Sequence, residues 1–250
     1  MRLANLSLLF VSSLAPLFGQ TVAKHPFTAE DWSTLHNAQP VAVAADGQSI
    51  LYSVNYGAAK GPTQHEWWTM HPDGTNREKL DLPADFHPEG FTRDGSALYG
   101  SFKVNDLMQF AVFAIKGIST TATPQLVTLL PNGVEAAVAA PNGARYAILA
   151  DPRPHDPQAG VHTVIEPGQT SLYVVNSDGT KGQWWCPDLK WIGGNAASLA
   201  WSADASSVAV LSTTPNLGFH SIRSSIDVCT DSGARRVAEV PDSAQTIGWS

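Results

Sequence analysis

The chain has 250 residues, and its 15 Lys+Arg against 22 Asp+Glu give a formal net charge of −7. This balance argues against a nucleic-acid partner, because proteins that bind phosphate backbones gather Lys and Arg on one surface. Beyond the N-terminus the sequence has one adjacent basic pair, Arg235-Arg236. A hydrophobic content of 43% is typical of a folded chain rather than a disordered one.

Residues 1–23 have the pattern of a secretory signal peptide. Arg2 gives a basic start, residues 3–18 are largely apolar, and small residues follow at Gly19 and Ala23. The apolar stretch contains Pro16 and is shorter than the ~20 residues that a membrane helix needs. We therefore expect cleavage after Gly19 or Ala23 and an exported protein, periplasmic or secreted, without membrane insertion.

Two cysteines, Cys186 and Cys229, would then lie in an oxidising compartment. The sequence leaves two states open, a pair of half-buried thiols and a disulfide, and we expect the thiols. Two cysteines fit no zinc-binding spacing.

Residues 24–40 form an entry segment that precedes the regular part of the chain. Thr28-Ala-Glu-Asp31 has the form of a capping box, which predicts a short helix of one or two turns.

A repeat then dominates the sequence from residue 41 to residue 250. Turn dipeptides precede apolar runs at Asp46-Gly47, Asp94-Gly95, Asn142-Gly143 and Asp204-Ala205. Successive turns lie 48, 48 and 62 residues apart, so the third interval carries an insertion. Such dipeptides supply the positive φ angles of tight hairpins.

The columns beside these turns also agree in chemistry. Three residues before the turn stand Val43, Phe91, Ala139 and Trp201, all apolar, and the next position is small in every repeat. A second hairpin signal follows within three of the repeats, at Asp73-Gly74, Asp178-Gly179 and Asp231-Ser-Gly233. Four strands in ~40–50 residues, repeated in tandem, are typical of a WD-like β-propeller blade. A β-sandwich gives no reason for matched columns at a fixed period.

The sequence therefore predicts an all-β protein, a β-propeller with four-stranded antiparallel blades. The blades are expected at residues 41–82, 87–130, 134–187 and 196–241, and a fifth begins at residue 245. Trp249 lies 48 residues after Trp201 and continues its column. Because an unpaired blade edge exposes backbone donors and apolar side chains, we expect the chain to be a fragment of a longer protein.

The residues Phe27-Thr-Ala-Glu-Asp-Trp32, Val43-Ala-Ala-Asp-Gly47, Trp67-Trp-Thr-Met-His-Pro-Asp-Gly74 and Phe91-Thr-Arg-Asp-Gly95 resemble the N-terminal propeller of the prolyl oligopeptidase family. The resemblance is to its acylaminoacyl-peptidase and dipeptidyl-peptidase branches and covers nearly the whole mature chain. Related repeats occur in the propeller of the periplasmic protein TolB. The repeats here depart from the Ser-Pro-Asp-Gly pattern, since Pro141 alone keeps the proline and Asn142 replaces the Asp.

The resemblance implies a serine peptidase whose propeller caps a C-terminal α/β-hydrolase domain and filters peptide substrates. An α/β-hydrolase presents its nucleophile in Gly-x-Ser-x-Gly, and this sequence has no such pentapeptide; Gly117-Ile-Ser119-Thr-Thr121 lacks the last glycine. We therefore expect this chain alone to be catalytically inactive, with no catalytic residue, cofactor or metal of its own. The alternative is a non-enzymatic, exported, TolB-like propeller that binds another protein as a scaffold.

One insertion is a candidate substrate or partner loop. Within Asp151-Pro-Arg-Pro-His-Asp-Pro-Gln-Ala-Gly160-Val-His162, the residues Arg153, His155, Asp156 and His162 gather in a Pro-rich stretch, and loops that outgrow their repeat often carry function. A solvated insertion without a ligand is the simpler interpretation and the one that we favour, because no third metal ligand is fixed by the spacing. The paired tryptophans, Trp67-Trp68 and Trp184-Trp185, are expected to pack in the core. The remaining histidines stay unassigned.

Overall fold

The computed structural model describes residues 36–56, 64–115, 123–153, 170–187, 189, 196–214, 223–240 and 246–249. In these ranges the chain forms sixteen strands and one short 3-10 turn, Ala196–Ser198. The strands make four sheets of four, each an antiparallel meander in which consecutive strands are neighbours. The predicted all-β propeller with four-stranded antiparallel blades is therefore confirmed. The signal peptide, the helix of the entry segment and Gly117 to Thr121 lie outside the described residues.

We number the blades in chain order. Blade 1 holds β1 (His36–Val43), β2 (Ile50–Tyr56), β3 (Gln64–Met70) and β4 (Glu78–Leu80). Blade 2 holds β5 (Phe86–Phe91), β6 (Ala97–Val104), β7 (Leu107–Ala114) and β8 (Gln125–Thr128). Blade 3 holds β9 (Ala136–Ala139), β10 (Arg145–Ala150), β11 (Ser171–Asn176) and β12 (Gln183–Trp185). Blade 4 holds β13 (Leu199–Trp201), β14 (Val208–Thr214), β15 (Arg223–Thr230) and β16 (Gly233–Val240).

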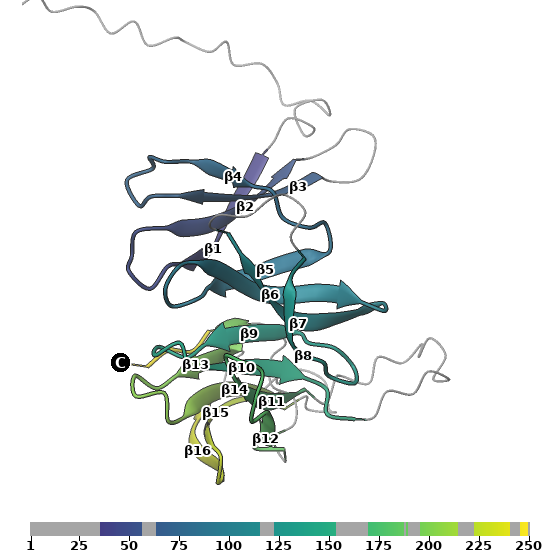
Figure 1. Cartoon of the computed structure of the whole chain (residues 1–250). Helices are drawn as coiled ribbons and strands as arrows, with labels where there is room; N and C mark the ends of the chain where they lie inside the picture. The colour runs from purple at the N-terminus through teal and green to yellow at the C-terminus, as the bar shows by residue number, and fades with distance from the viewer. Residues whose placement is uncertain are drawn as a thin grey trace, which may run out of the picture.

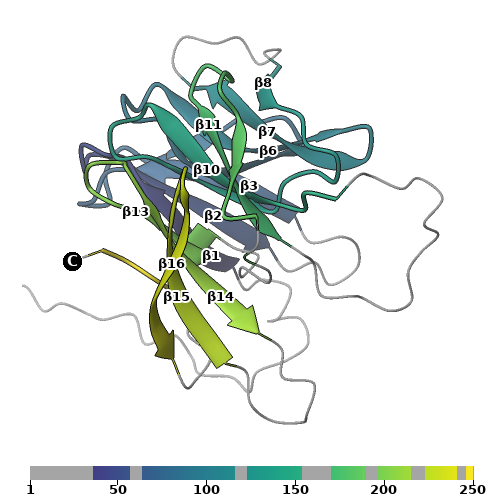
Figure 2. The same cartoon turned by 90° about the horizontal axis from the view of Figure 1, so that it is seen from below.

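The blades follow one another in space as they do in the chain (Figure 1). The first strands of successive blades are in contact, β1 with β5, β5 with β9 and β9 with β13. Seen from below, the strands of blade 4 run in a different direction from those of blades 2 and 3 (Figure 2). The sheets therefore fan around their first strands, which is the arrangement of propeller blades.

The four repeated turns close in the same way. In each turn the backbone N–H of the second turn residue donates to the carbonyl three residues earlier, at N···O distances of 2.8 to 2.9 Å. The donors are Gly47, Gly95, Gly143 and Ala205. All four residues have a positive φ, and for Ala205 it is 58°. Glycine adopts this conformation freely, whereas a Cβ makes it costly, which explains the recurrent turn glycine in the sequence.

Among the described residues, three apolar cores lie between successive blades. Leu51 packs with Phe91 and Leu98 between blades 1 and 2, and Tyr99 and Phe110 pack with Tyr146 between blades 2 and 3. The third core joins blades 3 and 4. Trp185 is 2% exposed in that core, and Trp67 and Trp184 pack against the edges of the other two. Trp68 is different, because it lies on the face of blade 1 away from blade 2, so the expectation of core packing was wrong for this residue.

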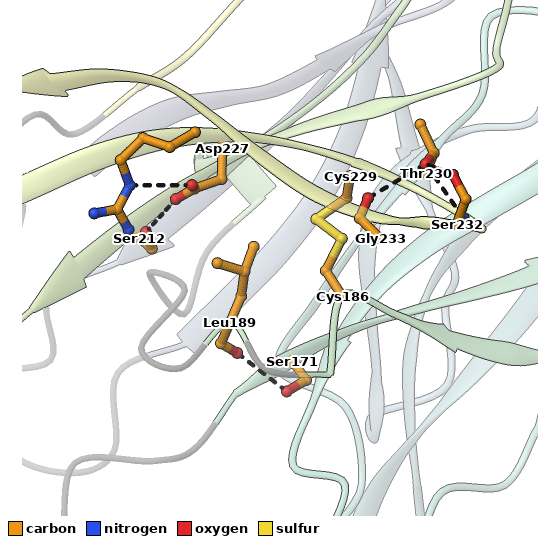
Figure 3. Close-up of a disulfide and its surroundings, with 10 residues drawn as sticks. Ser171, Cys186, Leu189, Ser212, Asp227, Cys229, Thr230, Ser232 and Gly233 are labelled. Carbon is orange, nitrogen blue, oxygen red and sulfur yellow. Dashed lines mark hydrogen bonds and ion pairs between the residues drawn. A yellow bond between two sulfur atoms is a disulfide. The ribbon is translucent and has the colours of Figure 1, made fainter.

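The third core contains a disulfide between Cys186 and Cys229, with a Cα–Cα distance of 5.9 Å. It ties the end of β12 in blade 3 to β15 in blade 4 (Figure 3). The expectation of two free thiols was therefore wrong. Sequence spacing did not reveal the pair because the two residues are brought together by the packing of two blades, 43 residues apart in the chain.

Candidate functional site

The insertion in blade 3 contains the sequence-predicted loop residues, of which the structure describes Arg153. Its guanidinium Nε lies 2.9 Å from both carboxylate oxygens of Asp151, and its carbonyl accepts a 2.6 Å bond from Nδ2 of Asn132. Burial opposes ionisation of Asp151, but the contacts with Arg153 prevail and hold the pKa of this carboxyl below its usual value. The other three, His155, Asp156 and His162, lie outside the described residues, so the grouping stays a prediction.

Asp94 and Asp204 of the repeated turns form hydrogen bonds within their own turns. Oδ1 of Asp94 accepts from the Thr92 hydroxyl at 2.7 Å and from the Ser96 amide at 3.1 Å. The Thr92 and Ser96 hydroxyls lower the pKa of Asp94 to about 2, and Ser202 and Ser206 do the same for Asp204. A carboxylate held this firmly in its ionised form is a poor general base, so these residues have a structural role.

A cavity of about 670 Å³ with polar and apolar lining lies between blades 1 and 2. It is lined by side chains of β2, β3 and β4 on one side and by the segment that leads into β5 on the other. Its polar lining consists of Asn55, His65, Glu66, Lys79, Asp81 and His87, and Trp67 forms part of its apolar wall. Two histidines from neighbouring blades thus line one cavity, and this is the candidate binding site of the described residues.

His65 is oriented by its neighbours on the same sheet face. Nδ1 lies 2.5 Å from Oδ1 of Asn55 on the adjacent strand, and the ring meets Trp67 edge-on at a centroid distance of 4.5 Å. Burial, with a smaller effect from nearby His87, lowers the pKa of His65. The neutral ring is therefore favoured at neutral pH. Since Asn55 offers an oxygen to Nδ1, that nitrogen carries the proton and Nε2 is left as an acceptor.

Glu66 lies at the rim of the cavity, and strand alternation directs its carboxylate to the face of β3 opposite His65 and Trp67. Its carboxylate accepts from the Tyr56 hydroxyl at 2.7 Å and from Nε1 of Trp68 at 3.1 Å, and it forms an ion pair with Lys79. Hydrogen bonds from Lys79 and then Tyr56 lower the pKa of Glu66 to about 2. The acceptors left for a bound polar group are Asp81 and Nε2 of His65, beside the ring of Trp67.

Metal chemistry has no support in this part of the molecule. Among the described residues, no group of three or more His, Cys, Asp or Glu is arranged to hold a metal ion. In the same ranges, no helix is long and apolar enough to cross a membrane.

Sequence reasoning left His65 and His87 unassigned. They are 22 residues apart on different blades, and neither lies in a ligand-like spacing. No pattern in the sequence indicated the pairing, because the two histidines meet only where blades 1 and 2 pack.

No family model matches the chain, and no curated protein sequence matches it. Solved structures do match. TolB from Acinetobacter baumannii has a TM-score of 0.54 at 14% identity, over 79% of this chain and 41% of that one. The β-propeller domain of the Trilobed protease from Pyrococcus furiosus has a TM-score of 0.52 at 8% identity, over 82% of this chain and 58% of that one. Pyrococcus horikoshii acylaminoacyl peptidase has a TM-score of 0.53 at 12% identity, over 87% of this chain and 35% of that one.

The shared feature is the β-propeller fold. At identities this low the similarity establishes the fold and nothing finer. The chain spans between 35% and 58% of the lengths of these three proteins. Propellers of peptidases and the propeller of TolB are both among the similar structures.

Proposed function

We propose that this chain is the substrate-gating propeller portion of an exported serine peptidase that resembles the prolyl oligopeptidase family. The observation that carries the proposal is the likeness of the four-blade arc to the propellers of two peptidases, at TM-scores of 0.52 and 0.53. The entry segment Phe27 to Trp32, with its resemblance to the same family, adds to it. Peptide hydrolysis then takes place on an α/β-hydrolase domain outside this chain.

The contribution of the propeller is selection by size and position. A rigid disc over a catalytic pocket admits short peptides and excludes folded chains, because a folded chain cannot enter without unfolding. The cavity between blades 1 and 2 adds a surface with polar and apolar groups on which a peptide can rest. Its acceptors, at Asp81 and Nε2 of His65, suit the N–H groups of such a ligand. No nucleic acid, cofactor or metal has a part in this proposal.

A second candidate is a non-enzymatic, exported scaffold that binds another protein. It is favoured by the TM-score of 0.54 with TolB from Acinetobacter baumannii. In both readings residues 1–23 act as the export signal, and neither reading requires insertion into a membrane.

The two candidates are separated by an activity probe on the natural gene product. The protein is purified from its own cells with an antibody against residues 36–240 and treated with a fluorophosphonate, which labels an activated serine. The peptidase proposal predicts a labelled polypeptide that yields peptides of this chain and hydrolyses short aminoacyl substrates faster than folded proteins. An unlabelled polypeptide that instead retains a stoichiometric protein partner would reject the peptidase and favour the scaffold.

A further inference from the structure

Two columns of the repeat carry different side chains from blade to blade, although both lie beside the repeated turns. Three residues after the first turn residue stand Ser49, Ala97, Arg145 and Ser207. Directly before the turn stand Ala45, Arg93, Pro141 and Ala203. We call the part of each blade interface where these turns lie its turn side. Two arginines of these columns, Arg93 and Arg145, reach from their own blade to the next.

Arg145 places a guanidinium in the interface of blades 3 and 4. Its Nη2 donates to the carbonyl of Ala205 in the turn of blade 4. Its Cζ lies 5.2 Å from the ring centroid of Trp201 and 5.3 Å from that of Trp185, distances at which a cation is attracted to an aromatic ring. A turn carbonyl and two rings thus form a guanidinium site, and the chain itself supplies the guanidinium.

The interface of blades 2 and 3 also has an arginine on its turn side. Nη1 of Arg93 donates to the carbonyl of Pro141 in the next blade. Arg93 also lines a cavity of about 610 Å³ at this interface. Two of the three described interfaces are therefore bridged on their turn side by an arginine of the chain.

The interface of blades 1 and 2 differs in both columns. They hold Ala45 and Ser49 there, which are small and uncharged. A cavity of about 560 Å³, here called the turn-side cavity, lies at this interface and has Ser49 in its lining. It is distinct from the cavity that contains His65 and His87. Neither column supplies an arginine here, whereas the other two described interfaces each have one.

The lining of the turn-side cavity repeats the surroundings of Arg145. By position relative to the turns, the counterparts are Gly95 for Ala205, Phe91 for Trp201 and Leu80 for Trp185, and all three line the cavity. Leu80 and Trp185 correspond because each lies seven residues after the Asp of the turn between the last two strands of its blade. The turn-side cavity thus has the frame of the Arg145 site without its arginine.

The charges of the two sites differ in the direction that favours a cation. At the interface of blades 3 and 4 two of the columns hold neutral amides, Asn142 and Gln183, and in the turn-side cavity they hold Asp46 and Glu78. Glu78 is two residues before Leu80, which packs in the core between blades 1 and 2, so both side chains lie on the sheet face toward blade 2. Two carboxylates replace two amides at a site that lacks its own arginine.

The two carboxylates are open to a ligand. Oδ1 of Asp46 accepts the N–H of Gln48 at 2.8 Å within its own turn, and Glu78 is exposed. None of the ion pairs between described residues includes either carboxylate. Arg77 also lines the cavity, but its Nε donates to the carbonyl of Gly74 in its own turn at 3.1 Å.

We propose that the turn-side cavity binds an arginine side chain of another polypeptide, with its guanidinium in the place that Arg145 takes at the interface of blades 3 and 4. The planar group lies on Phe91 and donates to the carboxylates of Asp46 and Glu78. Arginine suits the site better than lysine, because a flat fork of donors can stack on a ring and bind several oxygens at once. The site does not depend on the proposed peptidase activity.

The test is the binding of a fluorescent, acetylated Ala-Ala-Arg-Ala-Ala amide to the natural gene product, measured by fluorescence anisotropy at low salt. Every sample is first treated with a fluorophosphonate, so that an active serine cannot cleave the peptide. The same peptide with citrulline has the shape of arginine without its charge. We expect the arginine peptide to bind at least about tenfold more tightly than the citrulline peptide, because the carboxylates and the ring attract the charge.

A double variant connects the binding to the carboxylates. Asp46→Asn with Glu78→Gln gives the cavity the amides of the Arg145 site, and we expect it to weaken binding about tenfold, since each exposed carboxylate contributes modestly. The turn tolerates the first change, because Asn142 accepts the N–H of Ala144 at 3.0 Å in the equivalent bond.

Two further variants complete the set. Ser49→Arg supplies the cation from the chain, as Arg145 does, and should abolish binding. Asp85→Asn with Asp231→Asn removes the same charge at exposed positions that do not line the cavity, and should leave the affinity within about twofold, because charges far from the site are screened.

Four results would overturn the proposal. The first is equal affinity for the arginine and citrulline peptides, and the second is binding that neither the double variant at the carboxylates nor Ser49→Arg changes. Free L-arginine that competes as well as the peptide would overturn the assignment to a polypeptide. Binding that appears only in Arg77→Gln or Lys116→Gln would mean that a cation of the chain itself closes the cavity; Lys116 follows Ile115 of the lining and lies outside the described residues.

Discussion

The carboxyl of Glu89 is a pH-sensitive contact between blades 2 and 3. Glu89 lies at a bulge in β5, where the register shifts between Pro88 and Gly90, and its carboxylate accepts the backbone N–H of Ala137 on β9. Burial raises the pKa of Glu89 to about 7, against a smaller opposing effect of the Ala137 bond. Replacement by Gln keeps an oxygen that can accept this N–H and removes the charge.

The sign and size of the effect follow from the pKa of this group. The ordinary value is 4.5, so the folded state holds the proton of Glu89 more tightly than the unfolded state does. The resulting stability is complete below about pH 4.5 and is lost as the pH rises through about 7. The difference between these two pKa values corresponds to up to about 3 kcal/mol, at about 1.4 kcal/mol for each pKa unit.

The assay is urea unfolding of the wild type and of Glu89→Gln at pH 5 and at pH 8. We expect similar free energies of unfolding at pH 5, where much of the wild-type carboxyl is protonated. At pH 8 the variant should be more stable by up to about 3 kcal/mol, because the wild type then buries a charge. The titration of His65 occurs in both proteins and cancels in the difference.

Glu78→Gln is the matched control, since Glu78 is an exposed residue of β4, and it should change the free energy of unfolding little at either pH. If the difference between Glu89→Gln and the wild type is the same at pH 5 and pH 8, the reasoning about a buried carboxyl between the blades is wrong.

Three further changes probe packing between strands and blades. Gly100→Ala should destabilise by more than ~3 kcal/mol, since the added Cβ would lie 2.1 Å from the backbone oxygen of His87, as measured by urea unfolding. Reduction of Cys186–Cys229 should lower the unfolding free energy by about 2–4 kcal/mol, as expected for a loop of 43 residues; calorimetry with and without reductant measures it. Arg145→Leu should cost about 1–2 kcal/mol, because the guanidinium lies 5.2 and 5.3 Å from the centroids of two tryptophan rings, as measured by thermal unfolding.

The controls for these three changes are equally specific. Gly248→Ala adds a Cβ that meets nothing within 4 Å, and a loss as large as that of Gly100→Ala would remove the steric argument. A Cys186→Ala, Cys229→Ala double variant should match the reduced protein, and continued sensitivity to reductant would contradict the disulfide. Arg145→Lys keeps the charge without the planar group; if Arg145→Leu is as stable as the wild type, the contact with the rings contributes nothing.

Much of the architecture could be predicted from short stretches of sequence. Turn dipeptides such as Asp94-Gly95 fix a positive φ locally, and an apolar run beside each turn indicates a strand, so four hairpin-built sheets follow without tertiary information. The hairpin between β6 and β7 was not predicted. The Asn105-Asp106 turn between β6 and β7 has φ values of 49° and 67°, and it lacks the glycine that marked the others.

Properties that depend on contacts between two blades could not be predicted from the sequence. The pairing of Cys186 with Cys229, the cavity that His65 shares with His87 and the burial of Glu89 all arise where side chains of different sheets meet.

The charge balance of the chain argued against a nucleic-acid partner, which stays a prediction, and the repeat determined the kind of fold. The tertiary structure decided which face of each sheet is covered, and it showed that Val43 remains exposed where Phe91 and Trp201 are buried. The physical reason is the range of the forces involved. Turn geometry and the pairing of consecutive strands are set by residues close in sequence. Burial, pKa shifts and disulfide formation depend on which blade packs against the sheet.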